Sequence, residues 1–302
     1  MFKRNLCFVP QDVLIKAVKG FSQTPLRSTI AFTAITAIIQ SSSAVTAVTV
    51  SMVDAGILEF RSSIGIILGT NIGTCMTAQI MSLNLYHLAI PIFAAGILSF
   101  FISKKLGYFF MGLGALFEGL HLIGIGAEPL IHSPFFYKMI KAAEKKTIAC
   151  IIIGTAATAL AQSSSAVMGV IIALSQRGII DLNSAVALTL GSNLGTCATA
   201  LLASIGGNDA AKKTALAHLL LNLLGIIIIL PLFKPFTALS QATSDSLPRQ
   251  IANAHALFNI FSSLLVLPFA YAYAEMVSFI YRLIFDFMNR IMVFCTKLIK
   301  TR

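Results

Sequence analysis

Two polar motifs interrupt long apolar stretches of this 302-residue chain, and each motif occurs twice. The sequence Gln-Ser-Ser-Ser-Ala-Val begins at Gln40 and at Gln162, and the sequence Gly-(Thr/Ser)-Asn-(Ile/Leu)-Gly-Thr-Cys begins at Gly69 and at Gly191. Both pairs are 122 residues apart, and 20 of the 43 positions from Thr36 to Ala78 are identical to their counterparts. The chain is therefore an internal duplication, which predicts two structurally related halves.

The composition restricts the class of protein in which this duplication lies. Apolar residues make up 57% of the chain, charged residues 11%, and the mean hydropathy is +0.88. Soluble domains are about 45–50% apolar and about 25% charged, and disordered chains are far less apolar, so both classes are excluded. The sequence predicts an all-α polytopic membrane protein, a single membrane domain of roughly eight or nine segments of about 20 residues.

The duplicated polar clusters predict irregular backbone inside the membrane. Polar groups are costly in hydrocarbon unless protein or a water-filled cavity surrounds them. We expect each half to contain a re-entrant helical hairpin with Gln-Ser-Ser-Ser at its tip, over 28–54 and 147–176, and a broken transmembrane helix, over 62–83 and 183–204. Duplicated broken segments are the usual sign of a transporter's binding site. Small polar residues that merely allow close helix packing are the alternative.

The remaining apolar stretches complete the predicted architecture. Plain spans are expected at 86–103, 107–125, 213–232 and 252–274. The basic segment 134–146 is expected to form a surface helix, and the tail 276–297 an interfacial amphipathic helix or a final span. This organisation divides the chain into a first repeat (1–105), a second repeat (106–232) and a C-terminal span with an amphipathic tail (233–302).

The orientation of the halves follows from counting spans. Three spans separate the two hairpins, and an odd number of crossings makes the duplication an inverted repeat. One predicted side then carries 15 Lys and Arg and the other carries 7, so the richer side and both termini are expected to be cytoplasmic in the cell membrane. The counterpart of span 107–125 would fall before residue 1, and the first repeat is therefore expected to lack a leading helix.

Charge and cysteine content exclude several functions. The net charge of +11 reflects short loops and termini, where membrane topology and anionic lipids explain it better than nucleic acid does. The five cysteines form no Cys-x-x-Cys pair, so neither a disulfide framework nor a transition-metal site is expected. Residues 1–19 lack the apolar stretch of a cleavable signal peptide. No catalytic motif is present, and the chain is not expected to be an enzyme.

The residue types in the motifs indicate an anion and a hard cation as ligands. A half-helix that begins after each tip directs its N–H groups and positive dipole end inward, and serine hydroxyls add donors, which suits an oxyanion. Glutamine oxygens, threonine hydroxyls and unwound carbonyls suit Na⁺. Neither motif contains Lys or Arg, so bound cations would have to neutralise an anion, which is a physical reason for coupled transport. The residues alone do not name the anion.

The paired motifs resemble the type II sodium–phosphate cotransporter family, over roughly residues 25 to 275. Two Ala-His-x-x-x-Asn blocks, at Ala217 and Ala254, also resemble later spans of that family. The resemblance implies Na⁺-coupled symport of inorganic phosphate by alternating access, with an elevator-like motion by further analogy.

The same resemblance, extended to the first repeat by internal symmetry, implies two sets of ligands. The expected phosphate-binding residues are Ser41, Ser42, Ser43, Ser163, Ser164, Ser165, Asn71 and Asn193. The expected sodium-binding residues are Gln40, Ser41, Thr74, Thr77, Gln162, Ser163, Thr196 and Thr199.

Several alternatives remain open at this point. No acidic residue lies between Ile80 and His87, where electrogenic animal members carry an aspartate, and this favours electroneutral coupling. A symporter of sulfate or a dicarboxylate is the nearest alternative function, and a non-transporting membrane sensor is a second. His218 and His255 are expected to satisfy packing hydrogen bonds rather than to bind metal. The partners are phosphate, Na⁺ and the lipid bilayer, with no nucleic acid and no cofactor, and a homo-oligomer remains open.

Overall fold

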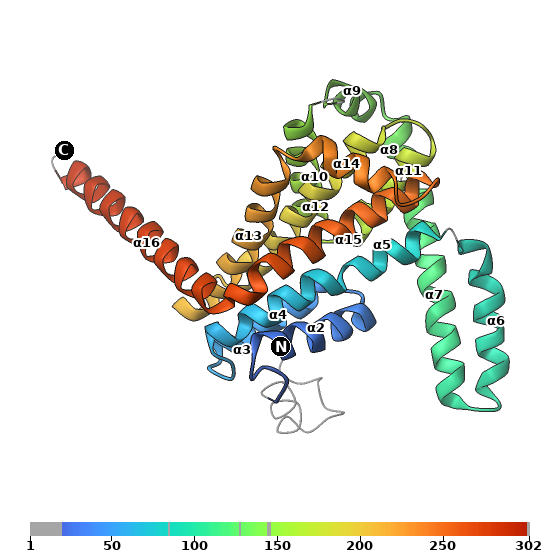
Figure 1. Cartoon of the computed structure of the whole chain (residues 1–302), viewed down its shortest axis with the longest axis horizontal. Helices are drawn as coiled ribbons and strands as arrows, with labels where there is room; N and C mark the ends of the chain where they lie inside the picture. Colours follow the sequence, from blue (N-terminus) through green and yellow to red (C-terminus); the bar gives the residue numbers. More distant parts are fainter. Residues whose placement is uncertain (1–19, 84, 127, 144–145, 301–302) are drawn as a thin grey trace.

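The computed structural model describes residues 20–83, 85–126, 128–143 and 146–300. The prediction about a signal peptide in residues 1–19 lies outside them. Every regular element within the described residues is a helix (Figure 1). These are α2 (Pro25–Ile39), α3 (Ser42–Asp54), α4 (Phe60–Gly73), α5 (Cys75–Ser82), η2 (Tyr86–Leu88), α6 (Ala89–Phe100), α7 (Lys104–Gly126), α8 (Glu128–His132), α9 (Pro134–Ala143), α10 (Thr147–Ala161), α11 (Ser164–Gln176), α12 (Leu182–Ala203), α13 (Asp209–Ile229), α14 (Phe233–Gln241), α15 (Leu247–Val266), η3 (Leu267–Phe269) and α16 (Ala270–Lys300).

Five helical segments are long and apolar enough to cross a membrane, which agrees with an all-α polytopic membrane protein. They are Phe60–Ser82, Lys104–Ile123, Leu182–Ala203, Asp209–Ile229 and Leu247–Phe287. The segment Tyr86–Phe100 is apolar but shorter than these. The number of crossings between the two hairpins, and with it the inverted orientation of the repeats, therefore stays a prediction.

Two helix pairs, α2–α3 and α10–α11, occupy the residues predicted to form the hairpins, and their re-entrant placement in the membrane stays a prediction. Their arms contain 15 and 13 residues in each repeat. At 1.5 Å per residue, a 15-residue arm is about 22 Å long, shorter than the hydrocarbon core of about 30 Å. Arms of this length fit a hairpin whose tip stops inside the membrane.

The second broken helix predicted from the sequence is continuous in the structure. α12 runs without interruption through the second copy of the glycine motif. In the first copy, the only boundary between α4 and α5 is Thr74, whose φ of −58° and ψ of −27° are themselves helical. The hydroxyls of Thr74 and Thr196 bond within their own helices, to the carbonyl four residues earlier, at 2.7 and 2.9 Å, as helical threonines commonly do. Unwound carbonyls are therefore not available from α12.

The motif glycines serve close helix packing instead. A Cβ on Gly191 would overlap the carbonyl oxygen of Ile151 in α10, and one on Gly69 would overlap that of Thr29 in α2. Threonine hydroxyls reinforce this contact, since that of Thr155 lies 3.1 Å from the Gly191 carbonyl. Small residues let backbones approach in a membrane, where van der Waals packing holds helices together. The alternative given above, that small residues in the motifs allow close helix packing, thus holds for the glycines.

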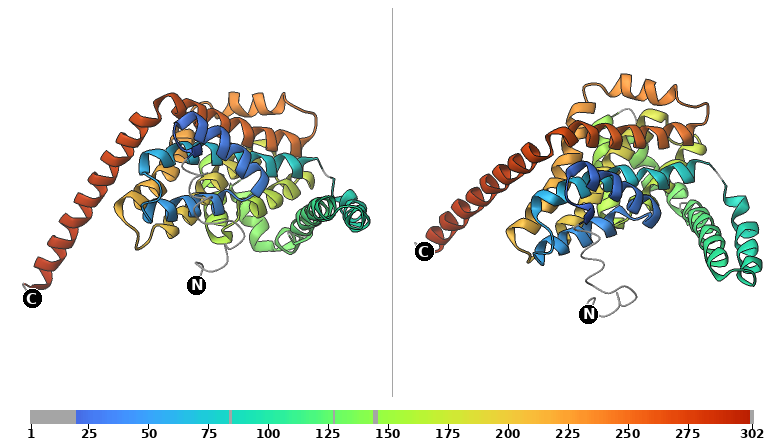
Figure 2. Two further views of the ribbon diagram at one scale, coloured as in Figure 1. Left: turned by 90° about the horizontal axis from the view of Figure 1, so that it is seen from below. Right: turned by 60° about the horizontal axis from the view of Figure 1, so that its bottom comes forward.

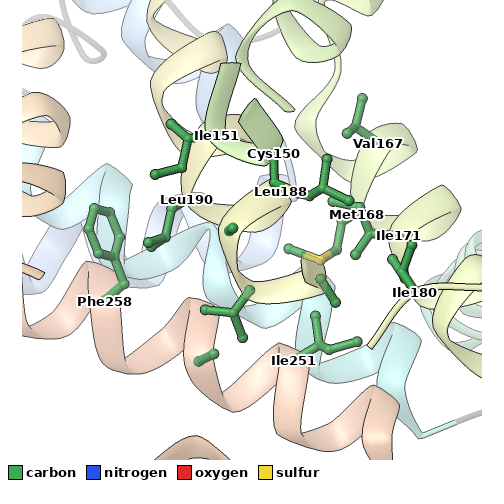
Figure 3. Packing of buried hydrophobic residues seen from close by; sticks show 14 of the residues in the cluster. Cys150, Ile151, Val167, Met168, Ile171, Ile180, Leu188, Leu190, Ile251 and Phe258 are labelled. Atoms are coloured by element: carbon green, nitrogen blue, oxygen red, sulfur yellow. The ribbon is translucent and has the colours of Figure 1, made fainter. Parts of the chain in front are cut away.

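The two repeats pack against each other through their hairpins. α3 of the first repeat contacts α12 of the second, and α11 of the second contacts α5 of the first. The largest apolar cluster lies around α10, α11, α12 and α15, where Ile151, Leu190 and Phe258 are buried together (Figure 3). This core fixes the second hairpin relative to α12, while the first hairpin packs in separate clusters that include Phe32, Val45 and Val50.

Two parts of the chain extend from this body (Figures 1 and 2). The pair α6–α7 packs mainly on itself, and α7 also contacts α11. α16 is anchored near its start, where the Tyr273 hydroxyl donates to the Ala217 carbonyl at 2.6 Å and Val277 is fully buried. Its later turns expose apolar side chains such as Phe285. The tail is thus helical as predicted, and its position at the interface stays a prediction, as do the three domain boundaries.

Candidate functional site

Each hairpin tip is a left-handed residue followed by a capping serine. Gln40 has φ 60° and Gln162 has φ 53°, and they are the only non-glycine residues with positive φ among the described residues. Ser41 and Ser163 are extended, and their hydroxyls accept hydrogen bonds from the amides three residues later, at 3.3 and 3.2 Å. This geometry ends one helix and starts the next, so that α3 and α11 begin at the tips with free N–H groups.

The predicted sodium residues meet in pairs within each repeat. The Thr77 hydroxyl donates to Gln40 Oε1 at 2.8 Å, and the Thr199 hydroxyl donates to Gln162 Oε1 at 2.7 Å. Each glutamine also donates from Nε2 to a carbonyl of its own helix, at 2.6 Å for Gln40 and 2.5 Å for Gln162, which fixes the direction of its oxygen. Each tip is thereby joined to the glycine-motif helix of the same repeat by two neutral oxygen atoms.

The two motif asparagines contact the histidines of the Ala-His-x-x-x-Asn blocks. His218 Nε2 on α13 lies 3.2 Å from Asn71 Oδ1, and His255 Nε2 on α15 lies 2.8 Å from Asn193 Oδ1. Asn71 also donates from Nδ2 to Asn222 at 3.4 Å, so both ends of its amide are engaged. The Nδ2 of Asn193 has no partner among the described residues. The expected packing role of the histidines agrees with these bonds.

The cysteines complete a reciprocal arrangement of the two halves. Cys75 of the first repeat donates to the His255 carbonyl at 3.8 Å, and Cys197 of the second donates to the His218 carbonyl at 3.5 Å. Each histidine helix therefore bridges the two repeats. Position 96, which lies 122 residues before His218, is a glycine, so α15 supplies the histidine that the first repeat's own sequence lacks.

A small cavity lies where the two repeats meet, and it has a volume of about 10 Å³. The first repeat contributes Thr74, Thr77 and Ala78 from α4–α5, and α15 contributes His255. The second repeat contributes Ser164, Ser165, Met168 and Ser192. Predicted sodium residues of one half and predicted phosphate residues of the other thus line one space. Its volume corresponds to about one water molecule.

The lining of this cavity contains hydroxyl, imidazole and apolar groups and no Lys, Arg, Asp or Glu. Neutral oxygen ligands suit Na⁺, and hydroxyl and helix N–H donors suit an oxyanion. No group of three or more His, Cys, Asp or Glu able to hold a metal ion is found among the described residues. A charged ligand placed here would therefore meet no fixed countercharge among the lining residues.

Other predicted site residues lie outside the lining of this cavity. Ser42 is buried and Ser43 half-buried in the first tip, while Thr196 is buried and Thr199 half-buried in α12. Sequence reasoning did not assign a ligand role to Ser192 or His255, which both line the cavity. The signal for Ser192 was its position in the repeated glycine motif. For His255 it was the second Ala-His-x-x-x-Asn block.

Comparison with known proteins identifies the family. A family model described as Na⁺/Pi-cotransporter matches residues 1–124 and 131–245, and each stretch contains one copy of both motifs. The chain belongs to the Na⁺/Pi-cotransporter family. This is a family of transporters, which confirms that the chain is not an enzyme and agrees with the resemblance seen in the motifs.

Individual relatives cover different shares of the chain. A Bacillus subtilis protein named "Uncharacterized protein YqeW" is 32% identical over 273 residues, 89% of each chain. An Escherichia coli K12 protein named "Putative inorganic phosphate export protein YjbB" is 30% identical over 245 residues, 78% of this chain and 44% of that protein. Mouse sodium-dependent phosphate transport protein 2C is 43% identical over 82 residues, 26% of this chain and 14% of that protein. No solved structure matches this chain.

Proposed function

We propose that the protein is a sodium-coupled symporter of inorganic phosphate in the cell membrane. The observation that carries the proposal is the cavity between the repeats. It joins Thr74 and Thr77 of one half with Ser164 and Ser165 of the other and has no charged lining residue. A phosphate dianion bound there would need neutralisation, because an unpaired buried charge is very costly. Bound Na⁺ supplies that charge and makes uptake of the two ions interdependent.

The sodium sites in this proposal are the two Gln–Thr pairs, Gln40–Thr77 and Gln162–Thr199, supported by the hydroxyls of Thr74, Thr196, Ser41 and Ser163. The phosphate sites are the two serine tips, residues 41–43 and 163–165, with Asn71 and Asn193 at the neighbouring helices. Each oxygen of a Gln–Thr pair is hard and neutral, as Na⁺ requires. The named serines and the first N–H groups of α3 and α11 supply donors for phosphate oxygens.

Transport then requires the site to open alternately to the two sides. The cavity of about 10 Å³ is too small for phosphate, so entry requires a tip to move away from the helices that face it. Once the tip has closed again, the arms of each hairpin and the packed glycine-motif helix of the same repeat form one unit through the Gln–Thr bond. Movement of such units relative to α6–α7 would be elevator-like, with both termini in the cytoplasm.

The test is uptake of labelled phosphate by proteoliposomes of the purified full chain. Vesicles with an inward Na⁺ gradient are compared with vesicles that have an equal K⁺ gradient, and empty liposomes are the control. We expect uptake only with Na⁺, with competition by arsenate and not by sulfate or succinate. Folded protein with no Na⁺-dependent phosphate uptake would overturn the proposal.

A second candidate is transport of phosphate in the outward direction, which the name of the Escherichia coli relative favours. Loading the vesicles with labelled phosphate and reversing the Na⁺ gradient tests it. Efflux that follows the reversed Na⁺ gradient supports the same coupling. Efflux that ignores Na⁺ would instead indicate an uncoupled exporter.

A further inference from the structure

His255 on α15 lies at the cavity between the repeats with a defined hydrogen-bonding pattern. Only 3% of its surface is exposed, and it lines the cavity together with Ser164 and Ser165. Its Nε2 atom lies 2.8 Å from Asn193 Oδ1. Its Nδ1 atom is buried and has no hydrogen-bond partner among the described residues. The ring therefore has one engaged and one unused nitrogen.

The engaged nitrogen determines the chemistry of the unused one. A carboxamide oxygen can only accept, so Nε2 must donate and must carry a proton. No acidic residue lines the cavity, and an imidazolium there would be an unpaired buried charge. A neutral imidazole has one N–H, so Nδ1 carries a lone pair and is a hydrogen-bond acceptor.

The other half of the molecule supports this assignment. Asn71 donates from Nδ2 to Asn222 Oδ1, which fixes its amide so that Oδ1 faces His218 Nε2 at 3.2 Å. The same Asn–His pairing occurs in both halves. His218, however, is not among the residues that line the cavity. The chain thus contains one histidine of this type at the cavity and one away from it.

We propose that His255 Nδ1 accepts the P–OH proton of phosphate and thereby selects phosphate over sulfate. Phosphate near neutral pH carries at least one P–OH donor, whereas sulfate carries none. A serine hydroxyl does not discriminate, because it rotates to donate to either anion. A fixed lone pair attracts a P–OH group and repels a bare anionic oxygen. The inference rests on the proposed function and concerns the specificity of that same site.

This interaction requires the open form of the site. The cavity of about 10 Å³ accommodates about one water, so the Ser164–Ser165 tip must withdraw before phosphate reaches Nδ1. His255 does not need to move with the tip, because it is held on α15 by Asn193 and its own helix. The acceptor is therefore already oriented when the tip opens, which is how preorganised sites gain specificity.

The test is the anion preference of His255→Gln. The glutamine Nε2 can replace the ring Nε2 as donor to Asn193, while the acceptor at Nδ1 is lost. Uptake of labelled phosphate is measured with sulfate and monofluorophosphate as competitors, the latter being a phosphate-like dianion without a P–OH proton at neutral pH. We expect the preference of the wild-type protein for phosphate over both competitors to fall by about tenfold or more in the variant.

His218→Gln is the matched control, because it makes the same change at the histidine away from the cavity. Any loss of packing should lower uptake in both variants, but His218→Gln should keep the wild-type preference. His255→Asn is the complement, since its oxygen can occupy the Nδ1 position while the bond to Asn193 is lost. It should keep most of the preference at a lower rate. Protection from thermal unfolding by phosphate and by monofluorophosphate provides the same comparison in detergent if a variant does not transport.

Two results separate this inference from the proposed function. An His255→Gln variant that binds phosphate with the wild-type preference, or an equal loss of preference in His218→Gln, overturns the inference alone. Wild-type protein that neither transports phosphate nor is protected by it overturns the proposed function and the inference with it.

Discussion

The two repeats carry nearly the same motifs but place them in different surroundings. In the first tip Ser42 is buried and Gln40 half-buried, whereas in the second tip Ser164 is half-buried and Gln162 exposed. The described cavity takes its serines from the second repeat and its threonines from the first. The mirror-image set is absent from the lining of that cavity. Nearly identical local sequences therefore do not produce two equivalent sites. The helices that pack beside each tip determine whether its serines line the cavity.

The difference arises from what packs on each hairpin. α3 packs on α4, α12 and α13, while α11 packs on α5, α12, α15 and α7. α7 precedes the second hairpin and contacts it, and the described part of the chain contains no counterpart before the first. Near the contact, a Cβ on Gly169 would meet the side chains of Ile123 and Met81. We infer that the second repeat contributes more to anion selection than the first.

The largest effect is expected when the close helix contact shared by both repeats is disrupted. In Gly191→Ala the added Cβ would overlap the Ile151 carbonyl, and in Gly69→Ala it would overlap that of Thr29. Neither backbone can move without separating two packed helices, so we expect destabilisation of about 3 kcal/mol, at the upper end for overpacking. Thermal unfolding in detergent measures it. Gly119→Ala, where the Cβ meets nothing within 4 Å, should be neutral or stabilising. A similar loss in all three variants would contradict the packing role.

The next largest effect is expected when equivalent serines of the two hairpin tips are replaced. Ser164→Ala removes a hydroxyl from the cavity, and Ser42→Ala removes its counterpart from a covered position. We expect the apparent phosphate affinity to fall about tenfold in Ser164→Ala, the worth of one buried hydrogen bond to a charged ligand. The apparent phosphate affinity of Ser42→Ala should fall by less than half of that amount, when both losses are expressed as logarithms of the fold-change. Concentration-dependent uptake measures both. Equal losses would show that the repeats contribute equally and would refute the asymmetry.

A related comparison concerns sodium. Thr199→Val and Thr77→Val each remove the hydroxyl that bonds to a tip glutamine, at 2.7 and 2.8 Å, with little change in volume. We expect each to raise the Na⁺ concentration for half-maximal uptake by about three- to tenfold. Thr49→Val, at a buried threonine whose hydroxyl bonds only within its own helix, is the control. Unchanged Na⁺ dependence in both site variants would remove the Gln–Thr pairs from the sodium sites.

The smallest effect is expected where the hairpin ends reach the surface. Arg177 at the end of α11 pairs with Glu128 at 2.6 Å, with side chains 38% and 52% exposed. Exposed pairs of this kind contribute about 0–1 kcal/mol and are screened by salt. Arg177→Gln should therefore shift thermal unfolding only slightly, and less in high salt. If Arg177→Gln lowered phosphate uptake more than Ser164→Ala does, this pair would instead have a role in movement of the second hairpin.

Much of the fold was predictable because it depends on local chemistry that is written in the chain. A polar Gln-Ser-Ser-Ser cluster inside an apolar segment requires a helix end and a helix start, and both hairpins have them at Gln40 and Gln162. The breaks predicted at the glycine motifs were wrong for α12, which is continuous, since glycine is compatible with a break and with close packing. Only the partner helix, α10 for Gly191, distinguishes the two.

The sequence by itself determined the membrane class, the duplication, both hairpins and the residue types offered to a cation and an anion. These follow from hydropathy, spacing and side-chain chemistry, which need no knowledge of neighbours in space. Tertiary structure alone decided that Thr74 and Thr77 face Ser164 and Ser165 across the repeats, and that His255 rather than His218 lines their cavity. Those contacts join residues far apart in the chain, and they depend on how α5, α11 and α15 pack around a shared core.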